Sequence, residues 1–276
     1  MFQFKLIGNN PLGAISRHLC KLPTFAGYAT DDVLINDWTL KRFKFESASG
    51  YFSDLSDYGV GVALLRGNTT WMTLTPLEAE SQLIAQYSAS GKVVIAGLGL
   101  GLILHSILAK KNVSQIVVLE VDKDLIDNYP TLLSAKTRKE YDRALNSGRL
   151  KILHCDCKEP LPEHVLRQLH NVEYLWVDIW DDVNNQEALT DTLVIQKQVK
   201  AKRCDYWCCE IDLVMSCSRT GIFNITTLCE SARQSGLPLS VLSMSGHALQ
   251  LYAEICLKAT SLIHSRNAKP NFKLNY

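Results

Sequence analysis

Three glycines alternate directly after a short apolar run, and a carboxylate follows about twenty residues later, which is the arrangement of a βαβ nucleotide-binding unit. The apolar run covers residues 93–96, and residues 102–111 then read as a helix. Glycine lets the backbone turn sharply and approach a ligand, because no Cβ stands in the way. A second apolar run ends in Glu120, whose carboxylate we expect to accept hydrogen bonds from both hydroxyls of a ribose. The three glycines are Gly97, Gly99 and Gly101.

The spacing of these glycines narrows the class of ligand. A dinucleotide site needs glycines at the first, third and sixth positions. The sixth position is Leu102 when counted from Gly97 and Leu104 when counted from Gly99. The pattern therefore disfavours a dinucleotide, and an ordinary glycine turn of a parallel sheet, without any nucleotide, is the alternative.

Two later apolar runs also end in carboxylates. Residues 150–155 lead to Asp156, and residues 173–177 lead to Asp178. In an open parallel sheet, ligands lie beyond the carboxyl ends of the strands. We therefore expect Asp156 to face the same cleft as Glu120, with its carboxylate placed for an adenine amino group. The alternative is that Asp156 caps the turn before Pro160.

The last of these carboxylates belongs to a cluster, because Asp181 and Asp182 follow closely on Asp178. Crowded carboxylates repel one another, so the pKa of one should rise, which suits a general base or a site for a cationic amine. We predict Asp178 and Asp181 as catalytic candidates near the reactive end of the ligand. Capping is equally open for Asp181, and Asp182 is suited to solvent or to the N-cap of a helix over residues 183–200.

The elements that must position these residues divide the chain into three parts. Residues 1–74 are predicted to form a small N-terminal β-rich region, with an antiparallel hairpin that turns at residues 66–68. Residues 75–264 predict a nucleotide-binding domain of the α/β class, and residues 265–276 predict a polar tail. Within the second part, we expect a strand over residues 237–243, while residues 248–259 fit a helix or a strand.

The helix that opens the second part is expected over residues 75–87. Thr75 suits the N-cap, Pro76 the first position and Glu78 the capping-box position. Glu80 and Gln82 lie on this helix, where solvated side chains are favoured over side chains that face a cofactor. In the last third, Cys204, Cys208, Cys209 and Cys217 are interpreted as buried apolar residues, since no second pair of ligands supports zinc.

Composition limits the class of partner. The 276 residues carry a formal net charge of +1, which gives no reason to expect nucleic acid or an anionic membrane. The opening residues lack the features of a signal sequence, so we expect reduced thiols and a cytoplasmic protein. Residues 93–109 are too short and too rich in glycine for a membrane span of roughly 20 apolar residues. We expect a small-molecule substrate, with an amine among the options, and leave a homodimer open.

The glycine loop resembles motif I of class I S-adenosylmethionine (SAM)-dependent methyltransferases. With the β-rich start, residues 75–78, the pair Glu120 and Asp122, Asp156 and the Asp178-x-x-Asp181 step, residues 38–200 resemble the spermidine synthase branch of that superfamily. Similar chains occur as uncharacterised methyltransferase-like proteins of bacteria and phages. The resemblance implies a Rossmann-like class I methyltransferase fold. It also implies that Glu120 binds ribose, that Asp156 meets adenine, and that Asp178 and Asp181 handle an amine.

Two positions depart from this resemblance. Spermidine synthases carry an aspartate inside the glycine loop for the aminopropyl amine of decarboxylated SAM, and this chain has Leu100 there. Many methyltransferases carry an acid two residues before the first glycine, and this chain has Ile95. The loss of the loop aspartate weakens the case for an aminopropyltransferase more than the case for a methyltransferase.

We therefore expect a SAM-dependent methyltransferase that acts on an unidentified acceptor, with Asp178 near the sulfonium. The alternatives are a spermidine synthase-like transferase of an aminopropyl or aminocarboxypropyl group onto an amine, and a protein that binds SAM without turnover. No metal is required, because the sulfonium leaving group is already activated. The cofactor-binding residues that we expect are Gly97, Leu98, Gly99, Gly101, Glu120, Val121, Asp156, Cys157 and Asp178.

Overall fold

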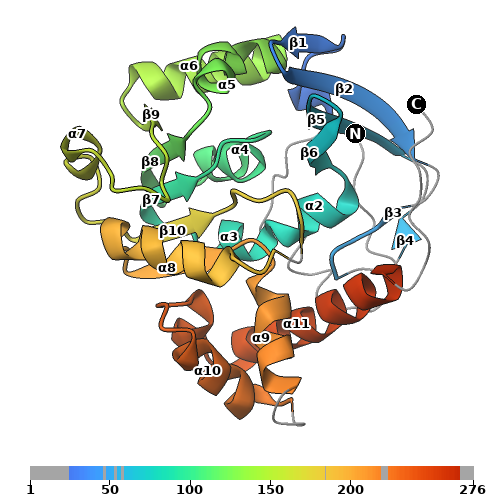
Figure 1. Ribbon diagram of the computed structural model, residues 1–276, viewed down its shortest axis with the longest axis vertical. Helices are drawn as coiled ribbons and strands as arrows, with labels where there is room; N and C mark the ends of the chain where they lie inside the picture. Colours follow the sequence, from blue (N-terminus) through green and yellow to red (C-terminus); the bar gives the residue numbers. More distant parts are fainter. Residues whose placement is uncertain are drawn as a thin grey trace.

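A computed structural model describes residues 25–45, 48–52, 55–56, 59–183, 185–218 and 223–267. The first 24 residues of the expected β-rich region and residues 268–276 of the expected tail lie outside the described residues. Figure 1 shows a parallel sheet with helices around it, an antiparallel sheet at its side, and a group of helices from the last part of the chain below it.

The parallel sheet has the strand order β11-β10-β7-β8-β9. The chain therefore starts in the middle of the sheet, builds outward through β8 and β9, and then returns to the other side of β7 with β10. This order reverses between β7 and β10, as in doubly wound nucleotide-binding folds. The prediction of a Rossmann-like α/β domain is confirmed. The strands are β7 (Gly91–Ala96), β8 (Val113–Glu120), β9 (Leu150–His154), β10 (Tyr174–Val177) and β11 (Arg203–Tyr206).

Burial explains why these segments are strands. Every residue from Val93 to Ala96 is buried, as are all four residues of β10. A parallel strand is covered by helices on both faces, so it reads as a continuous apolar run and not as an alternation. The helices that connect the strands are α4 (Leu102–Leu108), α5 (Lys123–Asn128), α6 (Ala135–Asn146), α7 (Glu163–Leu166) and α8 (Ala188–Val199), with a 3₁₀ turn η2 (Tyr129–Leu132) before α6.

The N-terminal sheet is antiparallel, with the order β1-β2-β5-β6. Its presence confirms the expected N-terminal β region, and β5 and β6 form the expected hairpin, in which Gly67 has a φ of +55°. A separate short pair, β3 with β4, follows β2. The strands are β1 (Val33–Ile35), β2 (Trp38–Phe45), β3 (Ala48–Ser49), β4 (Leu55–Ser56), β5 (Gly59–Arg66) and β6 (Thr69–Leu74), preceded by a 3₁₀ turn η1 (Phe25–Gly27).

The helix expected over residues 75–87 is two short helices. α2 (Pro76–Ser81) and α3 (Leu83–Ser88) are separated by Gln82. The predicted capping box is wrong, because Thr75 makes no side-chain cap bond. Its hydroxyl lies instead 3.2 Å from the hydroxyl of Thr73.

Two further boundaries differ from the predictions. α8 begins at Ala188 after Glu187 as N-cap, so Asp182 does not cap it. The strand expected over residues 237–243 is wrong, since Leu239 makes a single bridge to Cys204 and the chain then forms a 3₁₀ turn, η3 (Ser240–Ser243). The backbone N–H of Ser240 donates to the Asp205 carboxylate (3.0 Å). This hydrogen bond takes the place of one that Ser240 would donate to a neighbouring strand.

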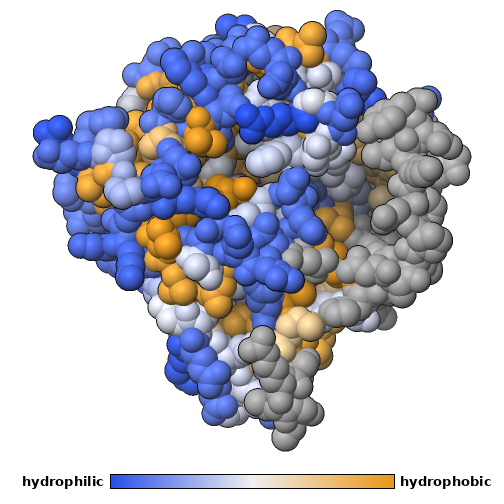
Figure 2. Space-filling view, in the orientation of Figure 1, coloured by the Kyte–Doolittle hydropathy of each residue, from blue (hydrophilic) through white to orange (hydrophobic). Residues whose placement is uncertain are grey.

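The last part of the chain is helical. It comprises α9 (Cys209–Ser218), α10 (Ile225–Gln234) and α11 (Gly246–Asn267), which contact one another. Cys204, Cys208, Cys209 and Cys217 are buried, which confirms their interpretation as apolar residues. On the face seen in Figure 2, hydrophobic residues form separate groups among hydrophilic ones. Among the described residues, no helix combines the length and the apolar character that crossing a membrane requires.

Candidate functional site

A cleft lies at the carboxyl ends of β7, β8, β9 and β10, where the order of the sheet reverses. The strand order and the place of the cleft define a Rossmann-like α/β protein with a candidate site at its switch point. Most of the residues predicted to bind a cofactor line this cleft. They are Gly97, Leu98, Gly99, Glu120, Val121, Asp156, Cys157 and Asp178.

The glycine loop connects β7 to α4 through three residues with positive φ. Gly97 has a φ of +95°, and a Cβ at this position would lie 2.0 Å from the carbonyl oxygen of Asp178. The backbones after β7 and β10 therefore cross too closely for any side chain. Gly101 has a φ of +67° and forms the N-cap of α4. It packs against the Tyr129 hydroxyl and is not among the residues that line the cleft.

The loop's own amides are largely occupied by protein acceptors. The N–H of Leu98 donates to the Glu120 carboxylate (2.7 Å), and the N–H of Leu100 donates to the sulfur of Met72 (3.2 Å). The N–H of Gly101 donates to the carbonyl of Leu98 (2.7 Å). A phosphate-binding loop needs such N–H groups free and directed at the ligand. The hydrogen bonds of this loop therefore favour a ligand without phosphates at this point.

Glu120 is buried at the end of β8 with its carboxylate fixed on both sides. One oxygen accepts the Leu98 N–H and the other accepts the Asp122 N–H (2.8 Å). Burial raises its pKa, while these two backbone hydrogen bonds act in the opposite direction. Because each carboxylate oxygen has a second lone pair, the group can still accept hydrogen bonds from ligand hydroxyls.

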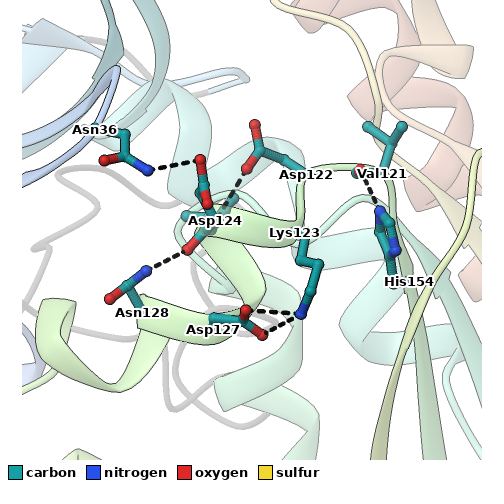
Figure 3. A network of polar contacts seen from close by, with 9 residues as sticks. Asn36, Val121, Asp122, Lys123, Asp124, Asp127, Asn128 and His154 are labelled. Atoms are coloured by element: carbon teal, nitrogen blue, oxygen red, sulfur yellow. Dashed lines mark hydrogen bonds and ion pairs between the residues drawn. The ribbon is translucent and has the colours of Figure 1, made fainter.

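Asp122 links this carboxylate to the N-terminal sheet. One of its oxygens caps α5 by accepting the Leu125 N–H (2.9 Å), and the other lies 3.5 Å from the guanidinium of Arg66. A second bond between the same two parts joins Asn36 to Asp124 (2.7 Å; Figure 3). The start of α5 is thus held by β5 and by the turn after β1.

Asp156 follows β9 with an exposed side chain that lines the cleft. Its carboxylate accepts the N–H of Lys158 (2.9 Å), so it also has the turn-forming role given as the alternative. Beside it, burial raises the pKa of Cys157 to about 12. This thiol stays protonated at neutral pH and supplies an apolar wall, not a nucleophile.

Asp178 meets two residues that the sequence did not place at the site. Gln82 is fully buried, against the prediction of a solvated side chain, and donates to the Asp178 carboxylate (2.8 Å). Burial raises the pKa of Asp178 to about 6, and the Gln82 bond opposes this rise. Glu78 is also buried, and its pKa lies well above the ordinary value because of burial and the nearby Asp178.

The expected crowding of Asp178 by Asp181 is wrong. The side chains of Asp181 and Asp182 are exposed, and Asp181 is not among the residues that line the cleft. The carboxylate that crowds Asp178 is Glu78 on α2. Glu80, also predicted to be solvated, is buried and accepts the N–H of Phe52 (3.0 Å).

The N-terminal sheet contributes a wall that the sequence analysis did not predict. Trp38, Arg66 and Trp71 line the cleft together with residues of the Rossmann-like domain, and Lys158 lines it from the turn after β9. No motif marks these residues. The only signal for them is the hairpin turn at residues 66–68, which places Arg66 and Trp71 on neighbouring strands.

No family model and no curated protein sequence matches the chain. Among solved structures, the spermidine synthase from Thermotoga maritima is 17% identical, with a TM-score of 0.33 over 61% of this chain and 51% of that chain. A spermidine synthase in complex with the transition state analogue AdoDATO is 18% identical, with a TM-score of 0.31 over 54% of this chain and 45% of that chain. The matching part of this chain thus spans about half the length of each of these two proteins.

Proposed function

We propose that the chain binds SAM or a close relative in this cleft and catalyses the transfer of a group from it. In this proposal, Glu120 accepts hydrogen bonds from the ribose hydroxyls. Asp156 accepts a hydrogen bond from the adenine amino group, and Val121 and Cys157 also contact the nucleoside. Asp178 lies near the sulfonium, beyond Gly97. The residues fit such a ligand because the cleft has a carboxylate at the end of each of β8, β9 and β10.

The hydrogen bonds of the glycine loop carry this proposal. Leu98, Leu100 and Gly101 give their N–H groups to the protein itself. A nucleotide bound through phosphates would lack these donors, whereas a nucleoside with a cationic tail does not need them. Among the described residues that line the cleft, the two cations are paired, since Arg66 lies against Asp122 and Lys158 lies 3.3 Å from Asp191. The free charge of the cleft is therefore negative and suits a sulfonium or an amine.

The sulfonium supplies an activated alkyl group when it is bound, so the chain's own work is positioning and proton transfer. Asp178 is suited to the second task. A general base works best when its pKa is near the working pH, and the pKa of Asp178 is raised to about 6. Its hydrogen bond from Gln82 fixes the orientation of the carboxylate.

Glu78 supports transfer of an aminopropyl or aminocarboxypropyl group onto an amine as a second candidate. The loop aspartate that binds the donor's amine in spermidine synthases is replaced here by Leu100. Glu78 supplies another buried carboxylate next to Asp178, and no hydrogen bond from a described residue reaches its side chain. A protonated amine between the two carboxylates would satisfy both. A protein that binds SAM without turnover is the third candidate.

Calorimetric titration with SAM, decarboxylated SAM and methylthioadenosine tests the proposal. We expect Glu120→Ala to weaken binding roughly tenfold to a hundredfold, because one or two charge-assisted hydrogen bonds to the ribose are lost. The matched control is Glu163→Ala, since the Glu163 side chain is 82% exposed on α7. If the folded wild-type protein binds none of the three compounds, the proposed function is wrong.

The product distinguishes the candidates after binding is established. Methyl transfer yields S-adenosylhomocysteine, whereas aminopropyl transfer from decarboxylated SAM yields methylthioadenosine. Incubation with a panel of amines and other acceptors, followed by chromatography of the nucleosides, separates the two. Tight binding with neither product supports the non-catalytic candidate.

A further inference from the structure

The last strand of the N-terminal sheet contains a β-bulge at Trp71. In the ladder between β5 and β6, Leu64 pairs with Met72 and Leu65 pairs with Thr70, so Trp71 has no partner. Consecutive residues of a regular strand point to opposite faces of the sheet. Trp71 and Met72 nevertheless act on the same side, since Trp71 lines the cleft and the sulfur of Met72 accepts the Leu100 N–H of the glycine loop. Bulges commonly redirect a side chain next to a functional site in this way.

The redirected indole is held in place by its neighbours. The ring of Trp38 meets that of Trp71 edge to face, with centroids 5.8 Å apart and an angle of 89° between the planes. Trp38 itself is only 3% exposed, and the guanidinium of Arg66 lies 5.4 Å from the centre of its ring. Trp71 is half-buried and lines the cleft.

We infer that Trp71 is a ligand-contacting wall of the cleft, on which the nucleoside part of the ligand packs. This inference rests on the proposed function and assigns the N-terminal sheet a share in binding. The Rossmann-like side supplies hydrogen-bond acceptors at the strand ends, while the opposite side supplies a flat aromatic surface. A nucleoside matches this pairing, because it has hydroxyl and amino donors at its edges and apolar ring faces.

Titration calorimetry with methylthioadenosine and S-adenosylhomocysteine tests the inference on single variants. Both compounds carry the nucleoside without the sulfonium, so charge effects at Asp178 are kept small. We expect Trp71→Ala to weaken both by roughly 5- to 150-fold, the range of aromatic–base stacking. Trp71→Phe, which keeps a flat ring, should stay within about threefold of the wild-type protein. Leu34→Ala is the matched control, because Leu34 is 75% exposed on the same sheet.

The variant Trp71→Leu distinguishes direct contact with the ligand from a purely structural role of Trp71. This variant keeps an apolar side chain on β6 but removes the flat surface, so direct packing predicts a loss close to that of Trp71→Ala. Melting temperatures identify any variant that fails to fold, and Trp71→Phe and Trp71→Leu then carry the comparison. Wild-type affinity in Trp71→Leu, or in a folded Trp71→Ala, overturns the inference and leaves the proposed function standing. Absence of nucleoside binding by the wild-type protein overturns both.

Discussion

Asp178 lies at the end of β10, where burial raises the pKa of its carboxyl from an ordinary 3.8 to about 6. Between these two values the folded protein holds a proton that the unfolded chain has released. Proton binding by the folded state therefore exceeds that of the unfolded state, and stability must fall as the pH rises through this window. Above about pH 6 both states have lost this proton, so the loss of stability caused by burying the Asp178 carboxylate no longer changes with pH.

Asp178→Asn should remove this pH dependence. We expect the melting temperature of the variant to rise relative to that of the wild-type protein as the pH increases from 4 to 7, because the amide never ionises. Thermal unfolding at a series of pH values measures the difference. Asp181→Asn is the control, since Asp181 is exposed after the same strand, and it should follow the wild-type curve. A constant offset for Asp178→Asn across the range would contradict the prediction.

The sequence predicted some residues of the candidate site and missed others. Glu120, Asp156 and Asp178 could be found because each ends an apolar run, and strand ends meet at one edge of a parallel sheet. Glu78 and Gln82 could not be found, since a carboxylate and an amide near a helix start are usually solvated or capping. Their burial depends on the packing of α2 and α3, which no local pattern reports.

The glycine loop is the element in which local geometry is most restrictive. Gly97 and Gly148 both have positive φ, at +95° and +71°, but only Gly97 has an atom in the way of a Cβ, whereas Gly148 has open space. Gly97→Ala should therefore lower the free energy of unfolding by more than about 4 kcal/mol, because the carbonyl of Asp178 must move. Gly148→Ala should cost only the backbone strain, about 1–2 kcal/mol. Urea denaturation of both variants measures the two values, and equal losses would contradict the close approach of the backbones that follow β7 and β10.

Elements with a complete local signal could be predicted from the sequence. The apolar runs predicted as strands agree with β7, β8, β9 and β10 of the structure. The strand expected over residues 237–243 failed because a tertiary contact decided it. The Asp205 carboxylate takes the Ser240 N–H that a ladder would have used. Such competition is invisible in the local sequence.

At the scale of the whole molecule, the carbonyl oxygen of Leu100 joins three distant segments. It accepts the hydroxyls of Tyr28, from the N-terminal part, and of Tyr129, from η2, each at 2.9 Å. Both tyrosines are almost fully buried. The glycine loop is thus held from two sides by residues 72 and 29 positions away in the chain.

Tyr28→Phe should cost about 1 kcal/mol of unfolding free energy, since one hydrogen bond remains on the carbonyl. Tyr129→Phe should cost more than Tyr28→Phe, because the Tyr129 hydroxyl also lies 2.9 Å from Nε2 of His105 and that hydrogen bond is lost as well. The double variant should cost more than the two together, because a buried carbonyl is then left without either hydroxyl. Denaturant unfolding of the four proteins forms a double-mutant cycle that measures this coupling. Strict additivity would mean that the two hydroxyls stabilise the loop independently.

The boundary expected between residues 74 and 75 separates residues that line one cleft. Trp38, Arg66 and Trp71 precede this boundary, and they line the same cleft as Glu120 and Asp178. The sequence could suggest a β-rich region and a nucleotide-binding region side by side. The β-rich region completes the cleft of the nucleotide-binding region through long-range packing. Only the three-dimensional structure shows this packing.

The unpaired residue of β6 also makes this strand sensitive to changes in length. Removing Thr70 would restore a regular ladder with β5, and it would turn either the indole of Trp71 or the thioether of Met72 away from the Rossmann-like domain. Related chains that keep the cleft should therefore tolerate insertions and deletions at the hairpin turn after Arg66, but not within the few residues that follow it.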